Sequence, residues 1–189
     1  QRRQLARHCN NFLIQRHCPE GGVLRVLNLA SGPGRDMQRI LDRKPPRAVH
    51  FDCVEQDLNA IQYAREIYHH HLEKVTFIHK NVLRFSSPNK YDLVWSAGIF
   101  DYFDDKVFVR MLKRMTGLIS SCGEIVIGNF SPVNPSRAYM EIFEWRLQHR
   151  SPQKLRTLAK AAGFGDKYIR VDQEDTGVNL FLHVRSPGD

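Results

Sequence analysis

Two hydrophobic patterns alternate along the first two thirds of the chain. Short, nearly continuous apolar runs, typical of strands buried on both faces, are followed by stretches in which apolar residues recur every three or four positions, as on a helix. This alternation predicts a parallel sheet with helices on both faces. The expected strands cover residues 23–30, 48–54, 75–79, 91–97 and 124–129, and the expected helices cover residues 2–18, 34–43, 57–70 and 104–117.

The last third of the chain departs from this alternation. Two helices are expected in succession, over residues 136–148 and 152–162. Two strands, over residues 168–171 and 178–184, follow with a glycine turn between them and are expected to pair as an antiparallel hairpin. The expected fold class is therefore α/β: a doubly wound, mostly parallel seven-stranded sheet that ends in an antiparallel hairpin, within a single domain over residues 1–189.

The first expected strand ends in a turn of small residues, Ala30-Ser31-Gly32-Pro33-Gly34, and a helix follows at once. Small residues allow a sharp turn and a close approach to a ligand, and the start of a helix offers free N–H groups. A dinucleotide fingerprint would place its third glycine where Met37 stands, so NAD is disfavoured. We expect a nucleoside-bearing cofactor, and the alternative is an ordinary tight turn.

The same segment resembles motif I of the class I S-adenosylmethionine-dependent methyltransferases, an acid-x-G-x-G-x-G pattern. Asn28 stands in place of the acid and Ala30 in place of the first glycine. The resemblance implies a Rossmann-like methyltransferase fold and S-adenosylmethionine as the cofactor. The residues expected on the cofactor in this turn are Asn28, Ala30, Ser31, Gly32, Gly34 and Asp36.

Small and polar residues also stand at the ends of the next expected strands. Glu55 lies about 20 residues beyond the glycine turn, where an acid can accept both ribose hydroxyls of an adenosine. Gln56 is expected at the edge of the adenine. The alternatives are an exposed acid at a strand end and ordinary loop residues. The other expected cofactor-binding residues are Asn81, Val82, Ser96, Ala97, Gly98 and Phe100.

An acceptor site is expected where aromatic residues follow the fourth strand and where residues 131–150 form a lid. In the lid, Arg137 or Arg150 is expected to hold an acceptor carboxylate through two hydrogen bonds. The alternative is a core helix with Arg137 and Glu141 as a surface ion pair. The expected catalytic residues are Tyr102, Arg137, Tyr139 and Arg150, the expected substrate-binding residues are Phe103, Asn129, Phe130, Met140 and Trp145, and no metal site is predicted.

Three strings extend the resemblance over nearly the whole chain: AGIFDYFDD, IGNFSPVNPSRAYMEIFEWRLQHRS and GVNLFLHV. They resemble the bacterial methyltransferases that make 3-hydroxypalmitic or 3-hydroxymyristic acid methyl ester, a quorum-sensing signal. The resemblance implies methyl transfer to the carboxylate of a small acyl acid. A carboxylate is already ionised at pH 7, so this reaction needs no general base.

Composition and charge leave two rival functions open. The net charge of +8 permits binding to nucleic acid, so an RNA methyltransferase is one rival. Charge clustered around the pocket mouth would favour it; the Lys and Arg are dispersed along the chain, so the alternative is a solvated basic surface. The other rival is a non-catalytic protein that senses S-adenosylmethionine. No apolar run is long enough to span a membrane and no signal peptide is evident, so a cytoplasmic location with free thiols is expected. Because the chain begins at Gln1 without Met, upstream sequence is expected. An N-terminal regulatory region or a homodimer is a separate expectation.

Overall fold

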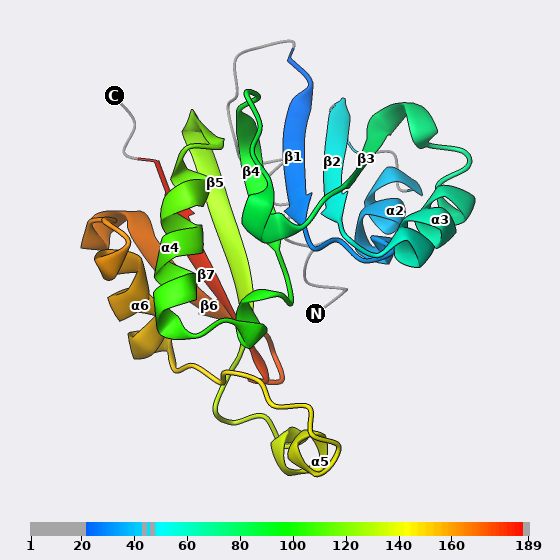
Figure 1. Ribbon diagram of the computed structural model, residues 1–189. Coiled ribbons are helices and arrows are strands. Elements are labelled where there is room, and N and C mark those ends of the chain that lie inside the picture. The colour runs from blue at the N-terminus through cyan, green and yellow to red at the C-terminus, as the bar shows by residue number, and fades with distance from the viewer. Residues whose placement is uncertain (1–21, 43–44, 46–47, 187–189) are drawn as a thin grey trace.

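The computed structural model describes residues 22–42, 45 and 48–186. Seven strands form one sheet in the order β3-β2-β1-β4-β5-β7-β6, and β7 runs antiparallel to both of its neighbours while the other pairs are parallel (Figure 1). The predicted fold class is confirmed. The strands are β1 (Leu24–Leu29), β2 (Val49–Glu55), β3 (Val75–His79), β4 (Tyr91–Ser96), β5 (Ile119–Phe130), β6 (Ile169–Gln173) and β7 (Asn179–Arg185). The expected helix over residues 2–18 lies outside the described residues.

Helices cover both faces of the sheet because the central strands are apolar on both sides. On one face α4 and α6 pack with β4, β5 and β7 into one hydrophobic cluster, and on the other face α2 and α3 pack with β1, β2 and β3 into a second cluster. The helices among the described residues are α2 (Arg35–Asp42), α3 (Leu58–Ile67), α4 (Asp105–Thr116), α5 (Arg137–Ile142) and α6 (Pro152–Ala161).

The order of the strands creates a switch point between β1 and β4. The chain builds outward from β1 through β2 to β3, returns to place β4 on the other side of β1, and then continues outward to β5. Loops that leave the carboxyl ends of β1 and β4 must therefore diverge to opposite sides. Ligands of open α/β sheets bind at such a point.

Two expected elements have different lengths in the structure. The fifth strand was expected over residues 124–129, but β5 begins at Ile119 and therefore includes Cys122. A register shift opposite Tyr91 accommodates Gly123, where a Cβ atom would lie 2.9 Å from the Tyr91 carbonyl oxygen. Both described cysteines are free, Cys53 buried and Cys122 exposed.

The helix expected over residues 136–148 is shorter, since α5 ends at Ile142. Glu144 then adopts a left-handed backbone conformation with φ +56°, which turns the chain back toward the sheet. Residues 131–150 form a projecting lobe with α5 at its tip (Figure 1). The Arg150 N–H donates to the Phe130 carbonyl oxygen at 2.9 Å, so the two ends of this lobe meet at the carboxyl end of β5.

Candidate active site

A cavity of about 430 Å³ opens at the carboxyl ends of the central strands, at the switch point between β1 and β4. This volume is typical of pockets for small organic ligands. Its wall comes from loops that follow β1, β2, β3 and β4. The lining residues are Ala30, Glu55, Gln56, Asn81, Val82, Leu83, Gly98, Ile99, Tyr102 and Phe103.

The turn after β1 is wound through left-handed backbone conformations. Ala30, Gly32 and Gly34 have φ values of +54°, +52° and +64°. At Gly34 the positive φ favours glycine, and a Cβ atom would lie 2.7 Å from the end of the Met37 side chain, which would have to shift. At Gly32 a Cβ atom would meet nothing within 4 Å. The turn therefore leaves open space above Gly32 and packs tightly against α2 beneath Gly34.

The Glu55 carboxylate joins this turn to the end of β2. Its Oε2 atom accepts a hydrogen bond of 2.8 Å from the Gly32 N–H, and its Oε1 atom accepts from the N–H groups of Gln56 and Asp57 at 2.8 and 3.0 Å. A carboxylate offers about four acceptor positions, so one remains on Oε2. Because Glu55 also lines the cavity, that position is available to a hydroxyl group of a ligand.

Two amide side chains meet on the adjacent wall. Asn81 Nδ2 donates to Gln56 Oε1 at 2.8 Å, while Asn81 Oδ1 accepts from the Leu83 N–H at 2.8 Å and so caps the short 3-10 turn Val82–Arg84. Within the described part of the chain, the Gln56 Nε2 group has no hydrogen-bond partner. The predicted residues Gln56, Asn81 and Val82 thus share one edge of the cavity with Leu83, which was not predicted.

The wall after β4 is apolar, with Gly98 at its base. A Cβ atom at Gly98 would meet nothing within 4 Å, and Ile99, Tyr102 and Phe103 line the cavity beside it. Phe100 was predicted on the cofactor, but its ring does not face the cavity: it is fully buried and packs edge-on against Phe103 and Phe108 in the core, with ring centroids 5.3 and 4.9 Å away. Its neighbours in the loop face the cavity instead.

Several other predicted cofactor-binding residues support the cavity without lining it. Asn28 is buried and its amide donates to the Met37 sulfur at 3.4 Å, so it points away from the cavity. Ser96 is buried and its hydroxyl donates to the Leu29 carbonyl oxygen at 3.2 Å. Ser31 donates to the Gly32 carbonyl oxygen. Ala97 packs against Gly128 of β5, and the Asp36 side chain lies outside the described residues.

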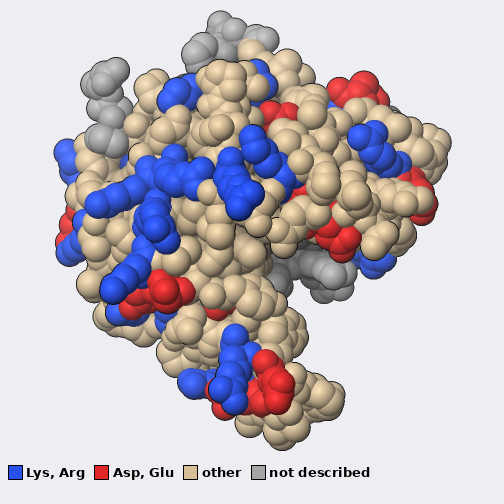
Figure 2. All heavy atoms as spheres, in the orientation of Figure 1, with Lys and Arg blue, Asp and Glu red and all other residues tan. Residues whose placement is uncertain are grey.

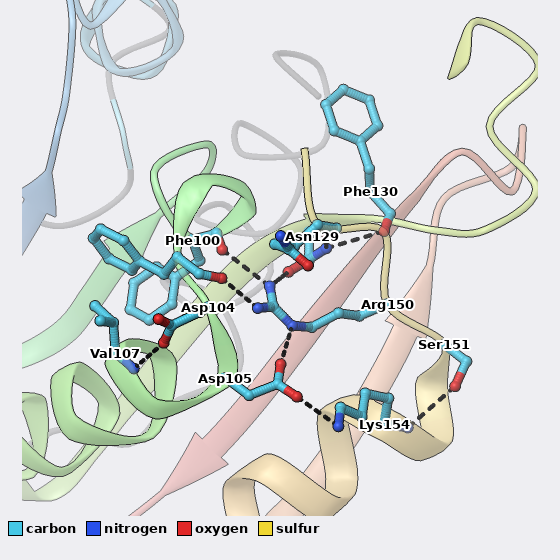
Figure 3. A network of polar contacts seen from close by, with 11 residues as sticks. Phe100, Asp104, Asp105, Val107, Asn129, Phe130, Arg150, Ser151 and Lys154 are labelled. Carbon is cyan, nitrogen blue, oxygen red and sulfur yellow. Dashed lines mark hydrogen bonds and ion pairs between the residues drawn. The ribbon is translucent and has the colours of Figure 1, made fainter. Parts of the chain in front are cut away.

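The structure places Arg150 in a buried network rather than on an acceptor (Figure 3). Its guanidinium donates to the carbonyl oxygens of Phe100 and Phe103, to Asn129 Oδ1 at 2.8 Å and to Asp105 Oδ1 at 3.2 Å, and the side chain is only 3% exposed. Lys154 and then Arg150 hold the pKa of Asp105 below its usual range. Arg150 is therefore corrected to a structural role, because its donors already hold the loop that forms the cavity wall.

Asn129 is part of the same buried hydrogen-bond network. Its Nδ2 group donates to the Gln148 carbonyl oxygen at 2.8 Å, and the residue is fully buried. Sequence reasoning missed Asp101, a neighbouring carboxyl group that is 1% exposed and accepts from the Phe130 N–H at 2.8 Å. Burial raises the pKa of Asp101 to about 7. Its place directly before Tyr102, in a loop predicted to form the site, is the one signal that could have singled it out.

The lobe contacts a second lining residue of the cavity, Tyr102, through Trp145. Trp145 Nε1 donates to the Tyr102 hydroxyl oxygen at 2.8 Å. Arg137 forms an exposed ion pair with Glu141 at 2.8 Å, as in the surface-pair alternative. Met140 is buried within the lobe, and the Phe130 ring packs beside His149. Exposed apolar side chains on the lobe are Val133, Tyr139, Ile142, Phe143 and Trp145.

The donors and acceptors of the cavity suit a nucleoside better than a nucleotide. A carboxylate stands at the glycine turn, and among the described residues that line the cavity there is no Lys, Arg or His. A phosphate would meet that carboxylate unfavourably, whereas a ribose hydroxyl would donate to it. No described helix is long and apolar enough to cross a membrane. No cluster of described His, Cys, Asp or Glu side chains is arranged to hold a metal ion.

Comparison with known proteins agrees with this geometry. Residues 26–123, just over half of the chain, match the sequence family described as "Methyltransferase domain". A curated relative, malonyl-[acyl-carrier protein] O-methyltransferase 1 from Ilyobacter polytropus, is 24% identical over 148 residues, 78% of this chain. The chain spans only 48% of the length of that relative.

Solved structures share the fold at low sequence identity. Magnesium protoporphyrin IX methyltransferase from Synechocystis PCC 6803, with bound SAH, superposes with a TM-score of 0.72 at 14% identity, covering 97% of this chain and 82% of that one. Human N-acetylserotonin methyltransferase in complex with SAM superposes with a TM-score of 0.71 at 14% identity, covering 100% of this chain and 52% of that one. Together with the family match and the sheet order, these similarities lead to one conclusion: the chain belongs to the methyltransferase domain family.

Proposed function

We propose that this protein binds S-adenosylmethionine in the cavity at the switch point and transfers its methyl group to the carboxylate of an acyl acid. The observation that carries the proposal is the position of Glu55, whose remaining acceptor site faces the cavity beside a turn with open space above Gly32. In this arrangement Glu55 holds the ribose, Gln56 and Asn81 face the adenine, and Gly98 leaves room for the methionine part. When bound, the cofactor supplies an electrophilic methyl group on a sulfonium.

The chain's own contribution is to position and desolvate the acceptor. Ile99 and Phe103 provide an apolar wall, and Tyr102 provides one hydroxyl group at the mouth. Because that hydroxyl oxygen accepts from Trp145, its proton is directed elsewhere and can be donated to an acceptor carboxylate oxygen. Since both arginines expected on the acceptor are engaged elsewhere, Tyr102 takes over that role in the proposal. In-line attack by the carboxylate then needs orientation but no base.

The first acceptor to test is a free 3-hydroxy fatty acid such as 3-hydroxypalmitic acid, whose methyl ester would serve as a signal. The apolar lobe supports this choice, because Trp145 lies against Tyr102 at the cavity and exposed aromatic side chains continue along the lobe. Burying an alkyl chain there would contribute about 0.8 kcal/mol per methylene. Methyl transfer to the carboxylate would convert an anion into a neutral ester.

A second acceptor is favoured by one specific similarity. The relative from Ilyobacter polytropus is a malonyl-[acyl-carrier protein] O-methyltransferase, so its name places the acyl group on a carrier protein. An acyl group held by a thioester has lost its own carboxylate. Only a dicarboxylic acyl group, such as malonyl, would then present a free carboxylate for methylation. The cytoplasmic location and the homodimer or regulatory region stay predictions within this proposal.

Transfer of a tritiated methyl group from labelled S-adenosylmethionine tests the proposal. We expect label in 3-hydroxypalmitic acid or in malonyl-pantetheine, and none in 3-hydroxypalmitamide or in total RNA. Tyr102→Phe should lower kcat/KM about tenfold, the scale of one lost hydrogen bond to a charged group, while cofactor affinity stays within about twofold. Label in RNA alone would favour the RNA methyltransferase. Cofactor binding without transfer to any of these acceptors would favour the sensor.

A further inference from the structure

One side of the molecule carries a band of cations that the proposed chemistry does not use. Figure 2 shows Lys and Arg side chains crossing the side of the molecule on which α4 lies. We define the basic face as six exposed residues of this band: Arg84, Lys90, Lys106, Arg110, Lys113 and Arg114. None of these six forms an ion pair with a described carboxylate, whereas Lys154 and Lys160 of α6 pair with Asp105 and Asp166.

The basic face reaches the cavity wall at the amino end of α4 and through the Arg114 side chain. The Arg114 guanidinium, near the carboxyl end of the helix, donates to the carbonyl oxygens of Leu83 and Phe85, and Leu83 lines the cavity. The amino end of α4 follows Phe103, which lines the cavity on another side. A molecule bound along α4 therefore has one end, at the amino end of the helix, next to the cavity.

We propose that the basic face docks an acidic protein that carries the acyl acceptor on a flexible arm and delivers it into the cavity. This inference rests on the proposed carboxyl methylation. The arm holds the acyl group as a thioester, so the group that reacts is a second, free carboxylate at its other end. One carboxylate oxygen forms a bond to the methyl carbon, the sulfonium–methyl bond breaks with its electron pair left on sulfur, and the products are a methyl ester and the neutral thioether. No oxidant, reductant or proton is needed.

The arrangement of the cations favours a protein partner over RNA. Lys106, Arg110 and Lys113 are spaced four and three residues apart, so they lie along one side of α4 and match carboxylates along one side of a partner helix. Single-stranded RNA is held by aromatic platforms as well as by cations. None of the exposed aromatic side chains among the described residues lies on α4 or on residues 84–90. Complementary charge of this kind mainly speeds association and is weakened by salt.

A double charge reversal tests the docking surface. Arg110→Glu/Lys113→Glu changes two exposed side chains that form no hydrogen bond with another described residue and do not line the cavity. The matched control is Arg39→Glu/Lys74→Glu, on the other half of the sheet (Figure 1). It makes the same charge change at the exposed Arg39 of α2 and at the half-buried Lys74 before β3, which pairs only with its exposed neighbour Glu73. The probes are a fluorescently labelled acyl carrier protein of net negative charge, loaded with a malonyl group, and malonyl-pantetheine without the protein.

We expect the Arg110→Glu/Lys113→Glu variant to weaken binding of the labelled carrier and raise its KM at least about tenfold, with malonyl-pantetheine affected less than about twofold. The control variant should behave as wild type, and salt should weaken carrier binding to wild type more than to the reversal variant. Equal carrier binding by all three proteins overturns the docking surface, even if free acids are methylated. Carrier binding that depends on the basic face without methylation of any acid overturns the proposed acceptor instead. A basic-face-dependent transfer of label to RNA overturns the protein partner.

Discussion

The backbone N–H of Phe130 donates a hydrogen bond of 2.8 Å to the carboxyl group of Asp101, which is 1% exposed. This contact joins the end of β5, where the lobe begins, to the loop that forms the apolar wall of the cavity. The Asp101 carbonyl oxygen also accepts from the Gln148 N–H at 2.7 Å, where the lobe returns. One buried residue therefore holds both ends of the lobe against the cavity wall.

The first prediction concerns the pH dependence of stability. Burial raises the pKa of Asp101 from 3.8 to about 7, so below pH 4 both folded and unfolded chains are protonated there. As the pH rises above 4, the unfolded chain loses this proton before the folded protein does. The free energy of unfolding of the wild type therefore falls until the folded protein also loses the proton near pH 7. Asp101→Asn keeps an acceptor for the Phe130 N–H and removes the titration. The difference in unfolding free energy between this variant and wild type should therefore increase by roughly 2–3 kcal/mol in favour of the variant as the pH rises from 5 to 8.

Urea unfolding at several pH values measures this difference. Asp105→Asn is the control, because the pKa of Asp105 is lowered, chiefly by its hydrogen bond with Lys154. The stability that Asp105 contributes is present above its unfolded pKa and is lost only as the pH falls through its folded pKa. Its difference from wild type should therefore stay constant between pH 5 and 8. A constant difference for Asp101→Asn as well would show that Asp101 does not titrate in this range.

The second prediction separates the two arginines of the lobe. Arg150→Ala should lower the unfolding free energy by about 3 kcal/mol, because it leaves buried carbonyl oxygens and Asn129 without their donor. Arg137→Ala should change it by less than about 0.5 kcal/mol, since the ion pair with Glu141 is exposed. Urea unfolding at pH 7 compares them. Equal small effects would contradict the structural role of Arg150.

The third prediction addresses the ribose site. Glu55→Ala should weaken S-adenosylmethionine binding by about 2–3 kcal/mol, the scale of hydrogen bonds to a charged group. Isothermal titration calorimetry measures the affinity, and thermal unfolding checks the fold, because Glu55 also accepts from Gly32. Glu55→Gln, which keeps the shape and one acceptor oxygen, should lose less. Unchanged affinity in a folded Glu55→Ala protein would refute the assignment.

The fourth prediction uses the open space at Gly98. Because a Cβ atom there would meet nothing within 4 Å, Gly98→Val should leave the melting temperature nearly unchanged. The added side chain would occupy space assigned to the methionine part of the cofactor, so affinity should fall at least about tenfold. Gly98→Ala should show a smaller loss in the same titration. A valine variant that binds the cofactor as wild type would place the ligand elsewhere.

The fifth prediction follows from the backbone of Ala30. Its φ of +54° is left-handed, which costs a residue with a Cβ atom about 1–2 kcal/mol. Ala30→Gly should therefore raise the unfolding free energy by about 1 kcal/mol, after the extra flexibility of the unfolded glycine is subtracted. Ala97→Gly, at a position without positive φ, should be destabilising. Chemical denaturation of both variants gives the comparison.

The sequence by itself determined the sheet and much of the cavity. Short, continuous apolar runs are typical of strands buried on both faces, and helices between consecutive strands favour parallel pairing. Carboxyl ends of adjacent parallel strands lie at one edge of the sheet, so residues that follow them must converge. For that reason Glu55, Asn81 and Gly98 could be placed at one site from their positions in the chain, and the cavity contains all three.

The length of the lobe helix could not be predicted in this way. Apolar residues at helical spacing in residues 136–148 satisfy the pattern of a longer helix. In the structure these side chains are largely exposed, so no packing extends α5, and the chain turns at Glu144 to bring Trp145 to Tyr102. The contact of Trp145 with Tyr102, 43 residues away in the chain, therefore outweighed the local preference of these residues for a helix.

Only the tertiary structure decided which candidate side chains face the cavity. Neighbours in one loop, such as Phe100 and Tyr102, divide between the core and the cavity according to what packs behind them. Arg150 donates to the Phe100 carbonyl oxygen, 50 residues earlier in the chain. The sequence pattern does not show that buried acceptor, so the guanidinium was assigned to a substrate instead. A buried polar group must find a partner wherever the fold supplies one, so the direction of such a side chain depends on the assembled core and not on local spacing.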